Sequence, residues 1–379
     1  MRNLKLLIPD LPKTSEVSRY LQEIDTNRWY TNFGILNDRF EKRLIESKIV
    51  FGADSRVPYV TTVVNCTLAI QLLLQSLKLK EHSRILLPAF TFPATALAVI
   101  NSNFEPVFCS VESENWLLTP RMADYLLSQF HFDAVIPVST FGHPVSATEW
   151  SAFAIRNNMH VVVDAACAIG AQAVAQNVHA AFSFHATKPF GIGEGGLCAS
   201  TDKSVIERVK SLSNFGFDGD LVASLGTNAK LSEYHAAVGL AQLDRWEKIK
   251  AQKIDMAFNL RERLKPLGLK LQTLHKRQIP SVFPFLLRDN YSLASVNDYL
   301  NREGVETRRW YCPPLHFHPA LNYIESHFNE CLHEMNINDF NHRLLGVPFH
   351  HMITDADIER IYTTIAKCLM EPKNKTIEK

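Results

Sequence analysis

The amino-acid sequence predicts an α/β protein with a mostly parallel sheet between helices and a smaller C-terminal α/β domain. From about residue 58 to residue 164, short apolar runs alternate with amphipathic segments. Strands that are separated by helices pair in parallel, and both faces of such a sheet are covered. The chain has 379 residues, which is more than one hydrophobic core usually supports. These observations favour a large domain joined to a smaller one.

The elements of the first half follow from β-branched apolar runs and from apolar residues at helical spacing. We predict strands at residues 59–64, 84–87, 106–109, 134–138 and 160–164, and helices at residues 67–77, 92–100 and 147–157. Thr67 is placed to cap the first of these helices. Ligands collect beyond the carboxyl ends of parallel strands, so Asp164, the last residue of its run, is a candidate site residue.

In the second half, the sequence pattern first predicts a long helix at residues 230–265. A strand is predicted at residues 282–287, a helix at residues 294–303 and a C-terminal helix from about residue 354. We expect a large domain over residues 1–245, including an N-terminal segment, and a small C-terminal domain over residues 246–379. The charged tail at residues 371–379 is expected to be frayed.

The composition argues against several classes of function. The 40 Lys and Arg residues nearly balance the 39 Asp and Glu residues, which leaves a net charge of +1. Such a balance gives no support to a nucleic-acid or membrane-surface role, although a sum does not exclude a local basic patch. No run approaches 18 apolar residues, and the N-terminus has no secretory apolar segment. The seven cysteines include no Cys-x-x-Cys pair, so we expect reduced thiols, no metal site and a cytoplasmic location.

Lys188 is the first candidate for chemistry. It follows the apolar run at residues 181–184 and precedes a glycine-rich turn at residues 191–196. A lysine in this position can be partly desolvated, which lowers the pKa of its ammonium group and supplies the neutral amine that imine formation requires. The alternative is a surface lysine in a loop.

Two further features point to the same cofactor, pyridoxal 5'-phosphate (PLP). A carboxylate such as Asp164 keeps a pyridine nitrogen protonated, so that the ring accepts electrons; the alternative is a helix-capping Asp. The run Asn65-Cys66-Thr67 precedes a helix, whose N-terminal amides suit a phosphate; the alternative is simple capping by Asn65 or Thr67. The order of the three features along the chain is more specific than any one of them.

The chain resembles the DegT/DnrJ/EryC1/StrS family of PLP-dependent sugar aminotransferases over nearly its whole length. The shared landmarks occur in order, as Thr31-Asn32-Phe33-Gly34 with Phe40-Glu41, Asn65-Cys66-Thr67-Leu68-Ala69, Pro88-Ala89-Phe90-Thr91-Phe92, Asp164-Ala165-Ala166, Phe182-Ser183-Phe184-His185-Ala186-Thr187-Lys188, Glu194-Gly195-Gly196, Asn214-Phe215-Gly216-Phe217 and Gly226-Thr227-Asn228-Ala229-Lys230-Leu231-Ser232-Glu233. The resemblance implies the PLP-dependent transferase fold of type I.

The resemblance also implies roles for single residues. Lys188 matches the lysine that forms the Schiff base with PLP, and Asp164 matches the partner of the pyridinium nitrogen. Phe92 stands where an aromatic ring commonly stacks on the cofactor. Cys66 and Thr67 match the backbone turn under the phosphate, although Cys66 replaces the glycine that the family often has there.

The remaining matches are more peripheral. Ser183 matches a side chain that also binds the phosphate, and Asn228 matches a residue that reaches the phosphate of the neighbouring subunit, which implies a homodimer with shared active sites. Cys167 stands where the family often has Gln or His against the ring, so we expect a weakened side contact. His185, on the same strand as Lys188, and His316 are candidate substrate residues.

A subset of the family shares four local patterns with this chain: Asn-x-Thr, SFHATK, NFGF and GTN-x-K-x-SE. This subset makes dTDP-4-amino-4,6-dideoxyhexoses, as the dTDP-4-amino-4,6-dideoxyglucose transaminases of O-antigen pathways do. The resemblance therefore implies transfer of an amino group from L-glutamate to C4 of a nucleotide-linked 4-keto-6-deoxyhexose. Amination at C3, a UDP-linked sugar and a non-catalytic regulatory protein stay open as alternatives.

Lys188 argues against the related sugar 3-dehydratases, which have histidine at this position. Arg308 and Arg309 could pair with a carboxylate or diphosphate, or be solvated.

Overall fold

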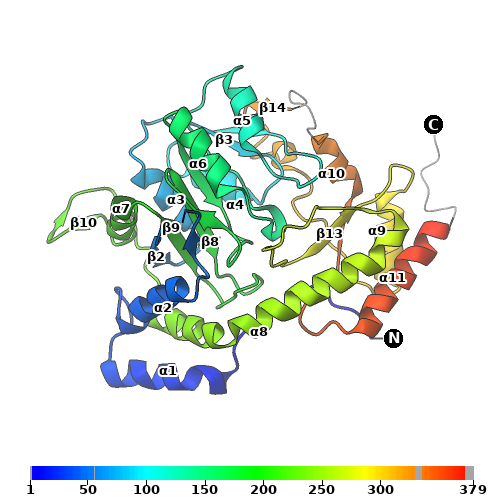
Figure 1. The fold of residues 1–379 in the computed structure, drawn as a ribbon, viewed down its shortest axis with the longest axis horizontal. Helices are drawn as coiled ribbons and strands as arrows, with labels where there is room; N and C mark the ends of the chain where they lie inside the picture. The colour runs from blue at the N-terminus through cyan, green and yellow to red at the C-terminus, as the bar shows by residue number, and fades with distance from the viewer. Residues whose placement is uncertain (1, 55, 329–334, 372–379) are drawn as a thin grey trace.

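The computed structural model describes residues 2–54, 56–328 and 335–371. Its centre is an eight-stranded sheet in the order β14-β4-β3-β5-β6-β8-β9-β2 (Figure 1). The strands are β2 (Tyr59–Val63), β3 (Arg84–Pro88), β4 (Glu105–Cys109), β5 (Ala134–Val135), β6 (His160–Asp164), β8 (Val178–Ser183), β9 (Gly196–Ser200) and β14 (Ser326–His327). Strand β9 runs antiparallel to both of its neighbours, and the other pairs in this sheet are parallel. The predicted α/β class and mostly parallel sheet are confirmed.

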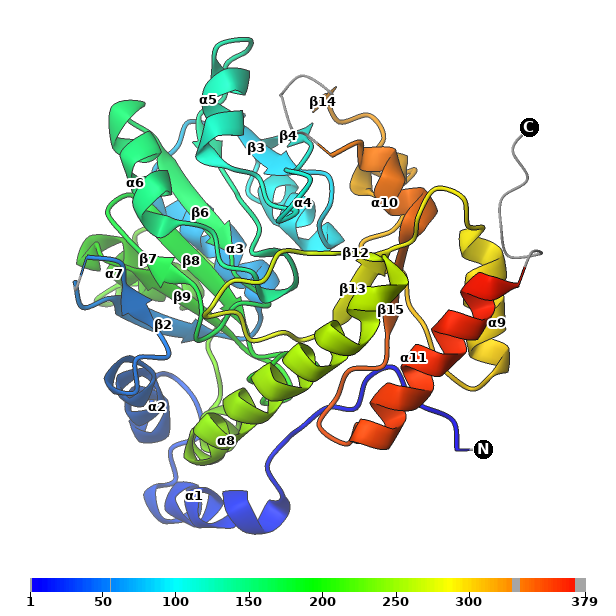
Figure 2. The same cartoon turned by 45° about the vertical axis from the view of Figure 1, so that its right-hand side comes forward.

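Helices cover both faces of this sheet (Figures 1 and 2). One face carries α3 (Cys66–Ser76), α4 (Pro93–Ile100) and α7 (Lys203–Ser213). The opposite face carries α5 (Pro120–Leu127), α6 (Ala147–Arg156), α2 (Ile35–Glu46), the first half of α8 (Glu233–Leu264) and, outside them, α1 (Thr14–Asn27). Because helices lie on both sides, every residue of β8 and β9 is buried, which explains their almost continuously apolar sequence.

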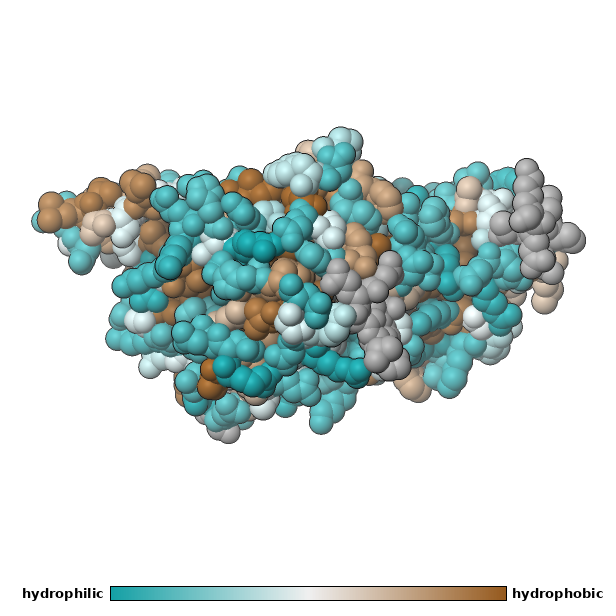
Figure 3. Space-filling model, turned by 90° about the horizontal axis from the view of Figure 1, so that it is seen from above, coloured by the Kyte–Doolittle hydropathy of each residue, from teal (hydrophilic) through white to brown (hydrophobic). Residues whose placement is uncertain are grey.

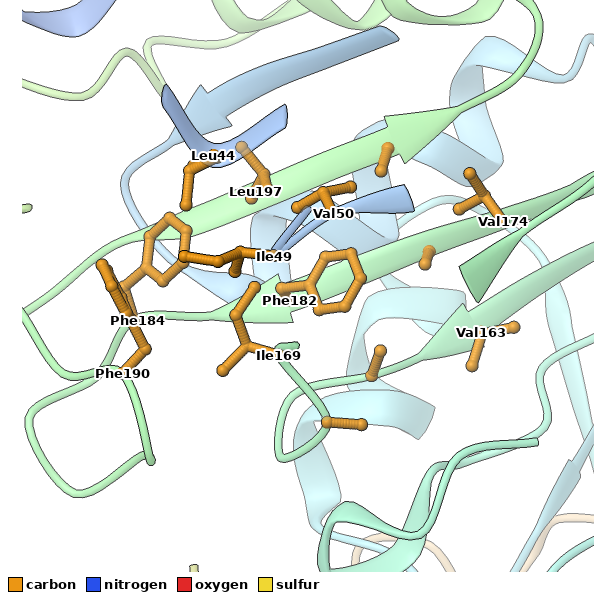
Figure 4. Packing of buried hydrophobic residues seen from close by; sticks show 14 of the residues in the cluster. Leu44, Ile49, Val50, Val163, Ile169, Val174, Phe182, Phe184, Phe190 and Leu197 are labelled. Carbon is orange, nitrogen blue, oxygen red and sulfur yellow. The ribbon is translucent and has the colours of Figure 1, made fainter. Parts of the chain in front are cut away.

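The core on the α2 side is built around aromatic rings (Figure 4). Phe182 on β8 belongs to the same buried cluster as Phe184 and Phe190, whose ring centroids lie 5.5 Å apart. Phe40 of α2 lies 5.5 Å from Phe184 and 6.1 Å from Phe190, measured between ring centroids. The segment that carries Lys188 is therefore anchored at both ends by rings in the main core.

The C-terminal part forms a smaller layer beside the large sheet (Figure 2). Its antiparallel sheet has the order β12-β13-β15, and helices α9, α10 and α11 pack near it. The elements are β12 (Lys270–Leu271), β13 (Phe283–Leu286), β15 (Leu344–Val347), α9 (Leu293–Arg302), α10 (Ile337–Arg343) and α11 (Asp355–Met370). The N-terminal segment joins this part, because the Leu4 amide donates to Gly304 O at 2.8 Å.

The remaining elements are short. They comprise the pair β1 (Phe51–Gly52) and β7 (Ala173–Val174), the hairpin β10 (Phe217–Asp218) with β11 (Leu221–Val222), and the 3₁₀ helices η1 (Thr140–Gly142), η2 (Lys265–Leu267) and η3 (Leu315–Phe317). The hairpin projects from the end of the molecule beyond α7 (Figure 1). No helix among the described residues is long and apolar enough to cross a membrane.

Most predicted elements are found within a few residues, with three local differences. Helix α3 starts at Cys66, and its cap is the side chain of Asn65, which accepts the Leu68 amide at 2.9 Å; the prediction of Thr67 as the cap is wrong. Of the strand predicted at residues 134–138, Ala134–Val135 pair in the sheet. The division at residue 245 falls inside the continuous helix α8 and stays a prediction. Residues 372–379 of the predicted frayed tail lie outside the described residues.

Candidate active site

Asp164 ends strand β6 and lies in a buried pocket of hydrogen-bond donors. Its side chain is 5% exposed. The Thr95 hydroxyl donates to Oδ2 at 2.7 Å, and the Ala166 amide donates to Oδ1 at 3.1 Å. Burial raises the pKa of Asp164 above its usual value, and these two donors and Lys188 offset part of that increase. When it is ionised, the Asp164 carboxylate is placed to hold a cationic partner.

Lys188 lies in the loop that follows β8, close to the segment after Asp164. Its Nζ donates to Cys167 Sγ at 3.2 Å. The loop is tight, because the Lys188 amide donates to His185 O and the Ala186 amide donates to Gly193 O. A Cβ on Gly191 would lie 2.6 Å from Ala186 O, so this turn requires glycine.

The expected lowering of the Lys188 pKa is not found in the protein without cofactor. Burial alone lowers the pKa of Lys188, as the sequence predicted. The Cys167 thiol and, after it, the Asp164 carboxylate more than offset that effect, so the pKa lies above its usual value. The expectation failed because it considered burial without the neighbouring acidic groups.

The start of α3 and the end of β8 form a cradle of polar groups. The first amides of a helix have no acceptor within the helix, and those of Cys66 and Thr67 open α3. Gly196 lies against this turn: a Cβ there would be 2.5 Å from Asn65 C and O. Gly196 pairs with Ser183 across the sheet, which brings the Ser183 hydroxyl to the same edge.

Two further candidate residues lie on segments next to this cluster. Phe92, just before α4, is 59% exposed and follows Thr91 on the segment that supplies Thr95. Cys66 is buried, and burial followed by the charge of Asp164 raises the pKa of its thiol well above the usual value. Lys188 acts in the opposite direction on the pKa of the same thiol.

Tyr311 is a site residue that sequence reasoning missed. Its hydroxyl lies 3.8 Å from Cys167 Sγ, and its ring stacks on Phe141 with centroids 5.0 Å apart. Burial, followed by the charges of Cys167 and Asp164, raises the pKa of Tyr311 well above its usual value. The hydroxyl therefore stays protonated as a hydrogen-bond donor. In the sequence, Tyr311 follows Trp310, and none of the patterns identified from the sequence includes it.

Among the described residues, the side chains of three candidates form no hydrogen bond or ion pair with Cys66, Asp164, Cys167 or Lys188. His185 is not on the strand with Lys188, because β8 ends at Ser183; its Nδ1 contacts the Thr187 hydroxyl at 2.8 Å. Asn228 is exposed and accepts from Lys230 Nζ at 2.8 Å. His316 packs against Phe317, with centroids 4.1 Å apart.

The two arginines that could bind an anion are also accounted for. Arg308 lies over the Trp310 ring at 4.4 Å, and Arg309 binds the side-chain oxygen of Asn341 at 2.9 Å. Both are exposed, so the alternative of solvated surface arginines describes them well.

The residues present fit PLP. An amine at Lys188 suits an aldehyde, a buried carboxylate at Asp164 suits a protonated ring nitrogen, and the free amides at the start of α3 suit a phosphate. The strongest structural observation is the contact between Gly196 and the turn at Asn65, because a strand that approaches a helix start so closely fixes where those amides point.

Comparison with known proteins identifies the same chemistry. A model of the DegT/DnrJ/EryC1/StrS aminotransferase family matches residues 13–366. The chain is similar to a dTDP-4-amino-4,6-dideoxy-D-glucose transaminase of Shigella dysenteriae, 27% identical over 370 residues, which covers 94% of this chain and 96% of that protein. It is 24% identical to a GDP-perosamine synthase of Vibrio cholerae over 92% of this chain and 94% of that one. A solved structure from Bacillus cereus, assigned as a PLP-dependent aminotransferase, superposes with a TM-score of 0.87 at 28% identity, over 96% of this chain and 100% of that one.

Proposed function

Since the chain belongs to the DegT/DnrJ/EryC1/StrS aminotransferase family, we propose that it transfers an amino group from L-glutamate to C4 of a nucleotide-linked 4-keto-6-deoxyhexose. The substrate that we propose to test first is dTDP-4-dehydro-6-deoxyglucose, for synthesis of O-antigen or another surface polysaccharide. Support comes from the name of the Shigella relative, which covers 94% of this chain. The name of the Vibrio relative refers to a GDP-sugar, so the experiment compares keto-sugars linked to different nucleotides.

The observation that carries the proposal is the position of Lys188 in the loop after β8, with its Nζ 3.2 Å from Cys167 Sγ, next to the strand β6 that ends at Asp164. PLP supplies an electron-accepting ring and a reactive aldehyde when it is bound. We assign Lys188 Nζ to hold that aldehyde and, when freed, to move a proton at the reacting carbon as general base and then acid. Asp164 would keep the ring nitrogen protonated, and the buried Thr95 hydroxyl would hold the carboxylate in place.

The other residues of the cluster would bind and orient. We assign the phosphate to the amides of Cys66 and Thr67 and to the Ser183 hydroxyl, and a stacking contact to the exposed Phe92 ring. Cys167 would contact the PLP ring only through its thiol, which is a weak hydrogen-bonding group. The neighbouring Tyr311 hydroxyl, 3.8 Å from that thiol, would supply the donor that Cys167 lacks.

We further propose a homodimer in which Asn228 reaches the cofactor phosphate of the partner subunit. Support comes from the hairpin segment that leads to Asn228: Leu225 is 95% and Leu221 is 75% exposed. Hydrophobic residues gather at the end of the molecule where this hairpin projects (Figure 3). Large exposed apolar side chains that cluster in this way favour an interface.

The test is a direct assay with purified protein, PLP and glutamate. Keto-sugars linked to dTDP, UDP and GDP are offered separately, 2-oxoglutarate is followed, and each amino-sugar is identified by NMR. The proposal expects turnover of the dTDP-4-keto sugar with nitrogen at C4. Amination at C3 or preference for a UDP- or GDP-sugar would replace the proposed substrate, and absence of turnover with every keto-sugar would favour a non-catalytic role.

A further inference from the structure

A large cavity lies on the α6 side of the sheet, away from the residues proposed to bind PLP. Its volume is about 1130 Å³. The walls come from residues 48–53 and 56–58, the starts of α5 and α6, the segment at residues 275–279 and Lys250 of α8. Cys66, Asp164 and Lys188 do not line it. The cavity is therefore distinct from the candidate active site.

The walls of this cavity carry more positive than negative charge, since Glu149 is the one carboxylate among the described residues that line it. Lys48, Arg56, Lys276 and Arg277 line it, and within the described parts of the chain none of the four forms an ion pair. A fifth cation, Lys250, is paired with Glu247 at 2.6 Å. Unpaired cations facing one space raise the local concentration of anions there.

Two helix N-termini add to this field. Helix α5 starts at Pro120 after its cap Thr119, and helix α6 starts at Ala147 after its cap Ser146; all four residues line the cavity. The N-terminal end of a helix carries a partial positive charge and amides without an acceptor in the helix. Both elements therefore turn the positive end of the helix dipole toward the same space as the four cations. Part of each helix start is already satisfied, because Pro120 has no N–H and the Thr119 and Ser146 hydroxyls accept the Met122 and Glu149 amides.

Two of the cavity side chains are held in place for binding. The Arg277 guanidinium lies over the Phe51 ring, 4.8 Å from its centroid, which limits its freedom before any ligand arrives. The Arg277 amide donates to Nδ1 of His275 at 3.1 Å. Since Nδ1 accepts this bond, the neutral His275 ring carries its proton on Nε2, where it can be donated to a ligand.

We propose that this cavity is a second ligand site, which binds a small phosphorylated metabolite carrying at least two negative charges. Arginine pairs phosphate oxygens with a planar set of donors, and helix starts bind the same group. A polymer such as a nucleic acid is a poorer fit, because the chain as a whole has a net charge of only +1. A ligand with a single carboxylate would leave most of the four cations unpaired.

The test uses the PLP-loaded protein and inorganic pyrophosphate as the probe, titrated by calorimetry at about 0.15 M salt, where weak surface attraction is screened. We expect one site per chain and tighter binding of pyrophosphate than of inorganic phosphate. The double variant Lys276→Gln, Arg277→Gln should weaken the affinity about tenfold or more, because it removes hydrogen bonds to charged groups. The control variant Lys42→Gln, Lys203→Gln removes two exposed lysines outside the cavity and should leave the affinity unchanged.

Hydrogen exchange locates the site in the same samples. Pyrophosphate should slow exchange at residues 275–279 and at the starts of α5 and α6. Three results would overturn the proposal: no saturable binding, equal weakening in the control variant, or slowed exchange confined to the start of α3 and the loop at residues 183–188. None of these measurements depends on turnover, so they are independent of the proposed transaminase reaction.

Discussion

Replacing Thr95 by valine tests how the buried acid of the candidate active site is held. The Thr95 hydroxyl has one proton, and its nearest acceptor is Asp164 Oδ2 at 2.7 Å, since Phe92 O is farther away at 3.2 Å. It must therefore accept from Thr91, whose hydroxyl lies 2.8 Å away. The three side chains form a chain of donors that runs from Thr91 to Thr95 to Asp164. All three are buried, so water cannot replace a lost donor.

The expected cost follows from the type of bond. Thr95→Val keeps the shape of the side chain and removes a hydrogen bond to a charged group, which should lower the free energy of unfolding by about 1.5–3 kcal/mol. Thr91→Val is the matched control, because it removes only a bond between two neutral hydroxyls and should cost about 0.5–1.5 kcal/mol.

The two variants should also differ in their pH dependence. Burial raises the pKa of Asp164 in the folded protein. The folded protein therefore becomes less stable relative to the unfolded chain as pH rises through this pKa and Asp164 ionises. The Thr95 donor offsets part of that loss. The penalty of Thr95→Val should therefore be larger at about pH 8 than at about pH 5, whereas that of Thr91→Val should stay constant.

Urea unfolding of the cofactor-free protein at both pH values measures these differences. The wild type and both variants are compared under identical conditions. If the free energy of unfolding falls with urea concentration at the same slope in all three, the compactness of the folded and unfolded states has not changed. If Thr95→Val costs no more than Thr91→Val at high pH, or if its penalty does not vary with pH, the donor chain to Asp164 is refuted.

Three further predictions concern the cofactor site and the interface. Asp164→Asn can still accept from the Ala166 amide but loses its charge, so kcat should fall about 10- to 100-fold with the fold retained by circular dichroism; unchanged kcat would contradict the assigned role. Gly196→Ala places a Cβ against Asn65, which should cost about 1–3 kcal/mol in urea unfolding and weaken PLP binding measured by absorbance; normal PLP affinity would mean that this turn does not bind the phosphate. Leu225→Ser should weaken self-association in sedimentation equilibrium, because it removes an apolar side chain that is 95% exposed in the single chain; an unchanged association constant would exclude the hairpin from the interface.

The sequence predicts the sheet and its helices well because their patterns involve residues close together in the chain. Apolar runs and helical spacing identify the strands β3, β4 and β6 and the helices α3, α4 and α6 within a few residues. The cap of α3 was misplaced because Asn65 and Thr67 are both good capping residues. Their backbone geometry, extended at Asn65, decides between them.

One motif pair of the family proves to be structural. The Glu233 carboxylate accepts the amides of Leu36 and Asn37 at 2.7 and 2.9 Å, so it caps the start of α2 from a distant part of the chain. Gly34 leaves the room for this contact, because a Cβ there would lie 2.6 Å from Glu233 Cδ. Neither residue could be assigned this role from spacing, since the contact joins segments about two hundred residues apart.

The parts of the site that the sequence did not reveal depend on contacts between distant segments. Thr95 is a helix residue with no motif of its own, and only the fold brings it to Asp164. Tyr311 reaches Cys167 from the C-terminal part of the chain. The pKa of Lys188 was misjudged for the same reason, because the acidic neighbours that raise it are distant in the sequence.

The most direct test of the assigned chemistry is the position at which PLP attaches. The PLP-loaded protein is reduced with borohydride, digested, and its peptides are mapped by mass spectrometry. We expect the phosphopyridoxyl mass on the peptide that contains Lys188, and its loss in Lys188→Ala. A stoichiometric adduct on a different lysine, or full transaminase activity in the variant, would contradict the account.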